Sequence, residues 1–209
     1  MKNNIKAVIF DMDGVLIDAK DWHYDALNKA LAIFGITISR MDHLTTFDGL
    51  STSQKLKMLS KLYSLPEELH GFINEMKQQY TMDITNQLCK PIFQHQFALS
   101  KLKEDGYKLA VASNSIRNTV EVMMEKSCLM PYLEFLLSNQ DVVNAKPAPD
   151  IYIKAINDLG FQPEECVIVE DNDNGIKAAR ASGAHVLKVE TVNDVTLENI
   201  TNFIEGLAC

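Results

Sequence analysis

The sequence predicts an α/β protein in which helices cover a parallel sheet and a helical segment is inserted after the first strand. Two observations predict this class. Short apolar runs, typical of buried parallel strands, alternate with helical patterns through most of the chain. Between residues 18 and 83, by contrast, no strand-like run occurs, and apolar residues recur at helical spacing.

Five apolar runs are expected to form the strands of one sheet. They are Ile5–Phe10, Lys108–Ala112, Phe135–Leu137, Cys166–Val169 and His185–Val189. Continuous apolar runs of this length are typical of strands that are covered on both faces. Because helical patterns separate the runs, we expect neighbouring strands to be parallel.

The helices between these strands are predicted from apolar spacing and from their end signals. Three of them span Ile116–Lys126, Ile151–Leu159 and Gly175–Ala181. Proline before the second helix and glycine after the second and third are typical helix boundaries. A further helix precedes the second strand, and its apolar face is expected to comprise Phe93, Phe97 and Leu102.

The inserted segment carries three apolar stripes at helical spacing. The first ends at Gly35, the second ends at Tyr63, and the third runs from Leu69 to Tyr80. We therefore predict a small helical cap domain over residues 18–83. Residues 1–17 and 84–209 are expected to form the core domain.

Composition limits the possible partners. The chain has 209 residues and a formal net charge of −8, which disfavours nucleic acid and anionic membrane surfaces as partners. No apolar stretch is long enough to span a membrane, and no signal peptide is recognisable. The four cysteines are far apart in the sequence, which disfavours a disulfide framework or a zinc site. Reduced thiols and a cytoplasmic location are therefore expected.

Two aspartates stand at the end of the first predicted strand. Asp11 follows the strand directly, and Asp13 comes two residues later. Ligands of open α/β sheets bind outside the carboxyl ends of the strands. Two carboxylates at such a place repel each other unless a cation or a changed protonation state compensates. The alternative is that the pair only opens a turn.

Three further polar groups follow later strands. Ser113 and Asn114 end the second strand, where a hydroxyl group and backbone N–H groups at a helix start can hold a phosphate. Lys146 is followed by Pro-Ala-Pro, which constrains its loop. Glu170 and Asp171 end a buried strand and provide hard oxygen ligands for a metal ion. The four groups are expected to meet at one edge of the sheet.

The same four groups resemble the motifs of a known family. Asp-x-Asp-Gly-Val, Ser-Asn, Lys-Pro-x-Pro and Val-Glu-Asp-x-x-x-Gly together are similar to the haloacid dehalogenase superfamily. More narrowly, the chain resembles the branch of phosphatases and β-phosphoglucomutases that carries a helical cap after the first strand. The resemblance extends from Ala7 to about Val189 and implies a Rossmann-like core with an inserted α-helical cap, and Mg²⁺ as the cofactor.

The resemblance implies a role for each group. Asp11 is the nucleophile and forms an aspartyl-phosphate, and Asp13 is the general acid and base. Lys146 balances the charge of Asp11 and the phosphate. Ser113 and Asn114 hold the transferring phosphoryl group. The implied metal ligands are Asp11, the backbone carbonyl of Asp13, Glu170 (directly or through water) and Asp171.

Two cap regions are expected to contact the substrate. In the resembling branch, the loop corresponding to residues 47–52 reaches the substrate, which implies substrate contacts from Gly49, Leu50 and Ser51. Alternatively, Ser51 only caps the next helix. His23 starts the first cap helix and is hypothesised to contact the substrate or position Asp13. The alternative is a partly buried cap histidine.

The function predicted from the sequence is a Mg²⁺-dependent phosphatase of a small phosphomonoester, with a sugar phosphate as the expected substrate. The alternative is a β-phosphoglucomutase-like phosphomutase, but the cap loop lacks the basic residue that such mutases place there. A signalling receiver domain is disfavoured by the helical insertion, and a silent binding protein by the intact acidic residues. The expected partner is a phosphorylated small molecule, with no nucleic acid or membrane, and the expected state is a monomer or weak homodimer.

Overall fold

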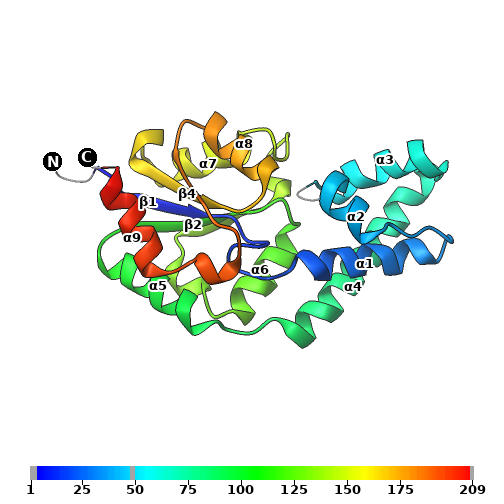
Figure 1. The fold of residues 1–209 in the computed structure, drawn as a ribbon, viewed down its shortest axis with the longest axis horizontal. Coiled ribbons are helices and arrows are strands. Elements are labelled where there is room, and N and C mark those ends of the chain that lie inside the picture. The colour runs from blue at the N-terminus through cyan, green and yellow to red at the C-terminus, as the bar shows by residue number, and fades with distance from the viewer. Residues whose placement is uncertain (1–3, 48–49, 208–209) are drawn as a thin grey trace. The chain divides into compact units, whose positions relative to one another are not determined.

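The chain folds into two compact units. The structure is a computed structural model that describes residues 4–47 and 50–207. Residues 1–18 and 90–209 form one unit, which we call the core unit, and residues 19–89 form the other, which we call the cap unit. Figure 1 shows both as ribbons. Among the described residues, no helix combines the length and the apolarity needed to cross a bilayer.

The core unit is built on a five-stranded parallel sheet with the order β3-β2-β1-β4-β5. The strands are β1 (Ala7–Phe10), β2 (Lys108–Ala112), β3 (Phe135–Leu137), β4 (Cys166–Glu170) and β5 (His185–Lys188). The predicted α/β class with a parallel sheet is confirmed. β1 begins at Ala7, two residues later than predicted, because its pairing partners begin at Lys108 and Cys166.

Helices cover both faces of this sheet. α7 (Asp150–Leu159) and α8 (Asp173–Ala181) lie on one face, and α5 (Phe93–Glu104) and α9 (Leu197–Gly206) lie on the other (Figure 1). α6 (Arg117–Lys126) packs against β3. The residues of β1 are completely buried, as expected for the central strand of a sheet covered on both faces.

The strand order determines where a ligand can bind. From β1 the chain continues to β2 on one side, whereas β4 lies on the other side of β1. In open α/β sheets, ligands bind at this kind of topological switch point, outside the carboxyl ends of the strands. Asp11, Ser113 and Asp171 directly follow β1, β2 and β4. The fold therefore brings the predicted motifs to one edge of the sheet.

The predicted apolar face of α5 is wrong for Phe93 and Phe97, whereas Leu102 is buried as predicted. Phe93 and Phe97 are 78% and 45% exposed, and their rings stack on each other with centroids 6.1 Å apart. The buried face is formed by His95, Ala98, Leu99 and Leu102. Burial of the His95 ring is compensated by a hydrogen bond of 2.8 Å between its Nε2 and the carbonyl oxygen of Val192. A polar residue therefore occupies the inner face that the apolar pattern assigned to phenylalanine.

All regular secondary structure among the described residues of the cap unit is helical. Its helices are α1 (Lys20–Ala32), α2 (Arg40–Asp42), a π-helical turn (His43–Phe47), α3 (Thr52–Tyr63) and α4 (His70–Leu88). α1 packs along α4, and buried aliphatic side chains such as Leu27, Leu31 and Ile73 form its core. α4 continues past residue 83, where its inner face carries polar Thr85 instead of apolar residues.

Candidate active site

The site is centred on the carboxylate of Asp11. Its backbone N–H donates to the carbonyl oxygen of Val169 at 3.0 Å, which extends the pairing of β1 with β4 by one residue. The side chain is therefore held at the switch point and is only 7% exposed. Lys146, from the loop between β3 and α7, donates through Nζ to Asp11 Oδ1 at 2.6 Å. Lys146 is itself only 3% exposed, so the pair is largely removed from water.

Glu170 anchors this arrangement at the end of β4. Its Oε1 accepts hydrogen bonds from Lys146 Nζ at 2.8 Å and from the Tyr152 hydroxyl at 2.9 Å. Its Oε2 accepts from the backbone N–H groups of Asp171 and Asn172 at 2.9 and 3.0 Å. Glu170 is 1% exposed, so these four donors replace its water shell. The carboxylate therefore fixes Lys146 on one side and the Asp171 loop on the other.

Position 175, in the first turn of α8, must be a glycine because the side chain of Glu170 lies too close for a Cβ atom. A Cβ atom at this position would lie 1.7 Å from Oε1 and 2.1 Å from Cδ of Glu170. The carboxylate cannot withdraw without losing its four hydrogen bonds. The missing side chain therefore allows α8 to pack directly against the anchoring carboxylate.

Substitution Gly175→Ala is expected to lower the stability of the core unit by about 3 kcal/mol, at the upper end of the cost of overpacking. The reason is the steric conflict with Glu170. Thermal unfolding measures the effect. The matched control is Gly71→Ala in α4, where an added Cβ meets no atom within 4 Å. If both variants unfold at the wild-type temperature, the close approach of Glu170 to Gly175 is wrong.

The carboxylates near Asp11 fit a divalent cation. Asp11, Glu170 and Asp171 each offer an oxygen, and these three oxygens lie within 4.8 Å of one another. When all three are ionised, the ammonium of Lys146 leaves two negative charges uncompensated. Carboxylate oxygens are the hard ligands that Mg²⁺ prefers. The donor set and the charge of this cluster therefore suit Mg²⁺.

The electrostatics of Asp11 agree with this fit. Burial raises the pKa of Asp11 well above its usual range, and the charges of Glu170, Asp171 and Asp13 add to this rise, whereas Lys146 opposes it. A cation beside these carboxylates favours their ionised forms. A metal ion would therefore restore the charged carboxylate that a nucleophile requires.

The partners of Asp11 keep their protons. Burial lowers the pKa of Lys146, but the charges of Asp11 and Glu170 outweigh burial, so its pKa is raised overall and it remains an ammonium. Burial, assisted by the charge of Glu170, raises the pKa of Tyr152 well above its usual value. Tyr152 therefore remains a neutral hydroxyl group that can both donate and accept a hydrogen bond.

Asp13 is tied to the loop that follows β2. The hydroxyl group of Ser115 donates to Asp13 Oδ2 at 2.8 Å. The backbone N–H of Ser115 donates to Ser113 Oγ at 3.0 Å, and Ser113 is completely buried. Gly14, with φ of +93°, makes the tight turn after Asp13, and its N–H donates to the Ile17 carbonyl at 2.7 Å. Asp13 and Ser113, predicted from separate motifs, are thus linked through Ser115.

Asn114 joins the loop after β2 to the loop that carries Lys146. Its Oδ1 accepts from the backbone N–H of Lys146 at 3.1 Å, and its Nδ2 donates to the Lys146 carbonyl at 3.3 Å. The backbone carbonyl of Asn114 accepts from Asn139 Nδ2 at 2.8 Å. The Asn114 side chain therefore holds the backbone of Lys146 in place.

The predicted cap residues belong to the cap unit. His23 lies in α1, and its Nδ1 is 3.1 Å from Lys77 Nζ. Ser51 is the N-cap of α3, where its hydroxyl oxygen accepts from the backbone N–H of Gln54 at 3.4 Å. The Leu50 N–H donates to the Phe47 carbonyl at 3.3 Å. Gly49 lies outside the described residues. Helix capping, the alternative expected for Ser51, is therefore observed.

Sequence reasoning missed two residues of the site. Tyr152 lies in the helix predicted after Pro-Ala-Pro, where the sequence pattern assigns it no role, although its hydroxyl group contacts both Lys146 and Glu170. Ser115 follows the Ser-Asn motif and contacts Asp13. A signal for Tyr152 was available, because it is a polar-tipped residue on the face that α7 turns to the sheet. Nothing in the sequence pattern distinguishes Ser115.

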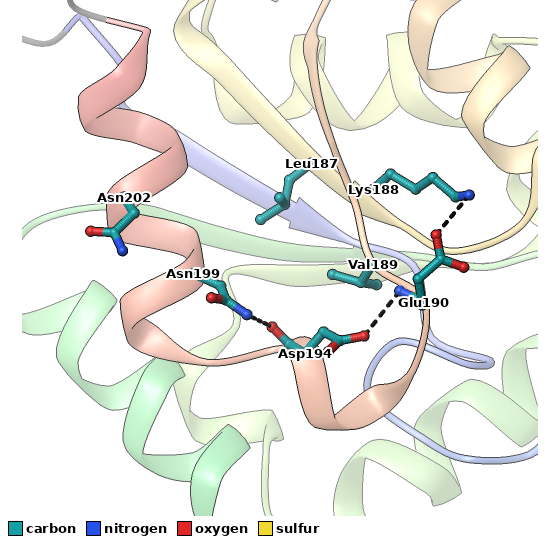
Figure 2. Close-up of a pocket in the computed structure, with 7 residues that line it drawn as sticks. All are labelled: Leu187, Lys188, Val189, Glu190, Asp194, Asn199 and Asn202. Atoms are coloured by element: carbon teal, nitrogen blue, oxygen red, sulfur yellow. Dashed lines mark hydrogen bonds and ion pairs between the residues drawn. The ribbon is translucent and has the colours of Figure 1, made fainter.

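A cavity of about 310 Å³ beside β5 and α9 is not part of this site (Figure 2). Four of its polar lining residues, Lys188, Glu190, Asp194 and Asn199, interact with one another. Lys188 forms an ion pair of 2.8 Å with Glu190, and Asp194 Oδ2 accepts from the Glu190 N–H at 3.1 Å. Asn199 donates to the Asp194 carbonyl at 2.8 Å. None of the predicted site residues lines it.

The chain matches the family model described as haloacid dehalogenase-like hydrolase over residues 8–189. One similar protein is a phosphorylated carbohydrates phosphatase of Thermotoga maritima, 26% identical over 192 residues, which cover 91% of this chain and 88% of that protein. Another is a fructose-1-phosphate phosphatase of Escherichia coli, 25% identical over 189 residues, which cover 90% of this chain and 98% of that protein.

A solved structure has the same fold. The β-phosphoglucomutase from Clostridium difficile superposes with a TM-score of 0.84 over 98% of this chain and 99% of that chain. Its sequence identity is 24%, so the likeness concerns the fold alone. The Rossmann-like core expected from the four motifs is thus observed.

Proposed function

Because the chain belongs to the haloacid dehalogenase-like hydrolases, we propose that it is a Mg²⁺-dependent phosphatase of small phosphomonoesters, with sugar phosphates as the substrate class. The observation that carries the proposal is the buried contact of 2.6 Å between Lys146 Nζ and Asp11 Oδ1, beside a cluster of three carboxylates. The two relatives named above, which act on a phosphorylated carbohydrate and on fructose 1-phosphate, support the substrate class.

In the first step, Asp11 attacks the phosphorus atom of the phosphomonoester. The bond between phosphorus and the leaving alcohol oxygen breaks, and that oxygen takes a proton from the Asp13 carboxyl group. The product is an aspartyl-phosphate on Asp11 and a free alcohol. Covalent catalysis of this kind replaces one difficult hydrolysis by two easier steps.

In the second step, Asp13 removes a proton from a water molecule, whose oxygen attacks the phosphorus atom of the aspartyl-phosphate. Inorganic phosphate leaves, and Asp11 returns as a carboxylate. Lys146 offsets the negative charge of Asp11 in both steps, and its ion pair of 2.6 Å with Asp11 supports this proposed role. The fixed ammonium acts without having to reorganise, which makes such groups effective in buried sites.

Mg²⁺ fits the acidic cluster, and the residues that would hold it are Asp11, Asp171 and the backbone carbonyl of Asp13. Bound there, it supplies further positive charge, which reduces the repulsion between a carboxylate and a phosphate dianion. Glu170 already accepts four hydrogen bonds from the protein. We therefore assign Glu170 mainly to the charge of the cluster and to the anchoring of Lys146.

The phosphatase proposal is tested by phosphate release from a panel of phosphomonoesters. The panel includes hexose 1- and 6-phosphates, nucleotides and the phosphate esters of glycolate-type acids. We expect release from sugar phosphates with Mg²⁺ and none after chelation of the metal. A second arm adds a sugar bisphosphate and measures isomer formation without net phosphate release. Isomer formation that depends on the bisphosphate would show that the enzyme is a phosphomutase rather than a phosphatase. If no member of the panel reacts in either arm, both proposals are rejected.

Substitution Asp13→Asn is expected to lower turnover by about 10²–10⁴-fold, the range typical of general acid–base catalysis. The reason is that an amide neither gives a proton to the leaving alcohol nor takes one from water. Steady-state phosphate release measures the effect. Asp18→Asn, after the turn that follows Asp13, is the control and should retain turnover. Equal activity of Asp13→Asn and the wild type would remove Asp13 from the mechanism.

A further inference from the structure

We propose that Tyr152 is a positioning residue that orients the ammonium of Lys146 between Asp11 and Glu170 through its hydroxyl group. The inference rests on the proposed function only for its effect on turnover. Tyr152 lies in the first turn of α7 and is completely buried. Its hydroxyl oxygen is 2.6 Å from Lys146 Nζ and 2.9 Å from Glu170 Oε1.

The hydrogen bonds of this group can be assigned without ambiguity. An ammonium has three N–H donors and no acceptor, and an ionised carboxylate only accepts. Lys146 has three acceptors within 2.8 Å, namely Asp11 Oδ1, the Tyr152 hydroxyl and Glu170 Oε1. The Tyr152 hydroxyl accepts from Lys146 and directs its own proton to Glu170. All three hydrogens of the ammonium are therefore directed at fixed acceptors.

Tyr152 is the neutral member of the three acceptors, so its bond to Lys146 contributes direction rather than charge. Without the hydroxyl group, the ammonium would keep both carboxylates but lose the acceptor for its third hydrogen. The site is buried, so water does not readily replace that acceptor. We therefore expect the ammonium to rotate and shift more freely against Asp11.

The aromatic ring makes a separate contribution that a substitution can preserve. Lys146 Nζ lies 4.5 Å from the centre of the Tyr152 ring, a distance typical of a cation–π contact. Phenylalanine keeps this contact and the packing of α7 against the sheet. Tyr152→Phe therefore removes the hydroxyl group alone and separates its role from that of the ring.

The expected result for Tyr152→Phe is a fall in kcat of about 10-fold, typical of losing a hydrogen bond to a charged group, with little change in KM. KM should change little because the Tyr152 hydroxyl group contacts the ammonium of Lys146 rather than the substrate. The matched control is Tyr107→Phe. Tyr107 directly precedes β2 and therefore lies at the amino end of that strand, whereas the site lies at the carboxyl ends of the strands. A purely structural role predicts wild-type kcat for both variants.

A second measurement does not depend on turnover. Hydrogen exchange of the Lys146 ammonium, followed by NMR with ¹⁵N-labelled protein, should be slow in the wild type and faster in Tyr152→Phe. Fast exchange in the wild type overturns the inference without any variant. Wild-type kcat in Tyr152→Phe, or unchanged exchange of its ammonium, also overturns it.

The same measurement separates this inference from the proposed function. If the wild type releases no phosphate from the panel but its Lys146 ammonium depends on Tyr152, the phosphatase proposal fails and the positioning role stands. If phosphate is released and the ammonium is indifferent to Tyr152, the proposed function stands and the positioning role fails.

Discussion

Asp11→Asn is expected to abolish turnover and the formation of any phosphorylated enzyme. An amide oxygen is a poor nucleophile and carries no charge for a metal ion, so both the chemistry and the cation site are lost. Phosphate release with Mg²⁺ measures the effect. The enzyme concentration must be high enough to detect about 10⁻⁴ of wild-type turnover, because removing a catalytic nucleophile causes a loss on this scale.

The fold of Asp11→Asn should persist, because Asn has nearly the same shape and Lys146 keeps its bonds to Glu170 and Tyr152. Thermal unfolding checks this point. Asp158→Asn, on the solvent side of α7, is the matched control and should keep full activity. Near-normal turnover in folded Asp11→Asn would show that another group is the nucleophile.

Lys146→Met is expected to lower turnover by about 10²–10³-fold, the loss typical of removing one fixed group that stabilises transition-state charge. It should also destabilise the protein by about 3–5 kcal/mol, as expected when one partner of a buried ion pair is removed. Both effects have the same origin, since Asp11 and Glu170 would remain buried without their ammonium. Phosphate release and thermal unfolding measure them.

Added Mg²⁺ provides a further comparison for Lys146→Met. The metal compensates part of the negative charge and should recover part of the lost stability, whereas turnover should remain low. Lys154→Met is the control, because its ion pair with Asp158 is exposed, and such pairs contribute about 0–1 kcal/mol. Wild-type turnover in Lys146→Met would contradict the charge-balancing role of Lys146.

The sheet and the assembly of the four motifs could be predicted from the sequence for a simple physical reason. Strands buried on both faces are continuous apolar runs, and a polar residue such as Asp11 marks where each run leaves the core. Because the strands are parallel, their ends share one edge. The resemblance seen in these motifs is confirmed by the family match over residues 8–189.

The partners inside the site could not be predicted in this way. Tyr152 meets Glu170 across 18 positions, and Ser115 meets Asp13 across 102, so neither contact leaves a local pattern. The four donors around Glu170 likewise become visible only in three dimensions. For this reason the sequence suggests Glu170 only as a metal ligand, whereas the structure shows that Glu170 anchors Lys146.

The inner face of α5 illustrates a different limit. Helical spacing places Phe93 and Phe97 on one apolar face of the helix. Spacing alone does not say which of two possible faces meets the sheet. The smaller Ala98 and Leu99 lie inside, and the two phenylalanines stack on each other outside. The choice depends on the space available between α5 and the sheet, which is a tertiary property.

The most direct test of the central claim is to map the phosphoryl group on the enzyme. Enzyme and Mg²⁺ are mixed with the fastest phosphomonoester of the panel, quenched in acid within the first turnover, and reduced with borohydride, which converts an aspartyl-phosphate to homoserine. Mass spectrometry of the peptides should find homoserine in place of Asp11. Absence of any modified residue during active phosphate release, or modification of a residue other than Asp11, would contradict the proposed mechanism.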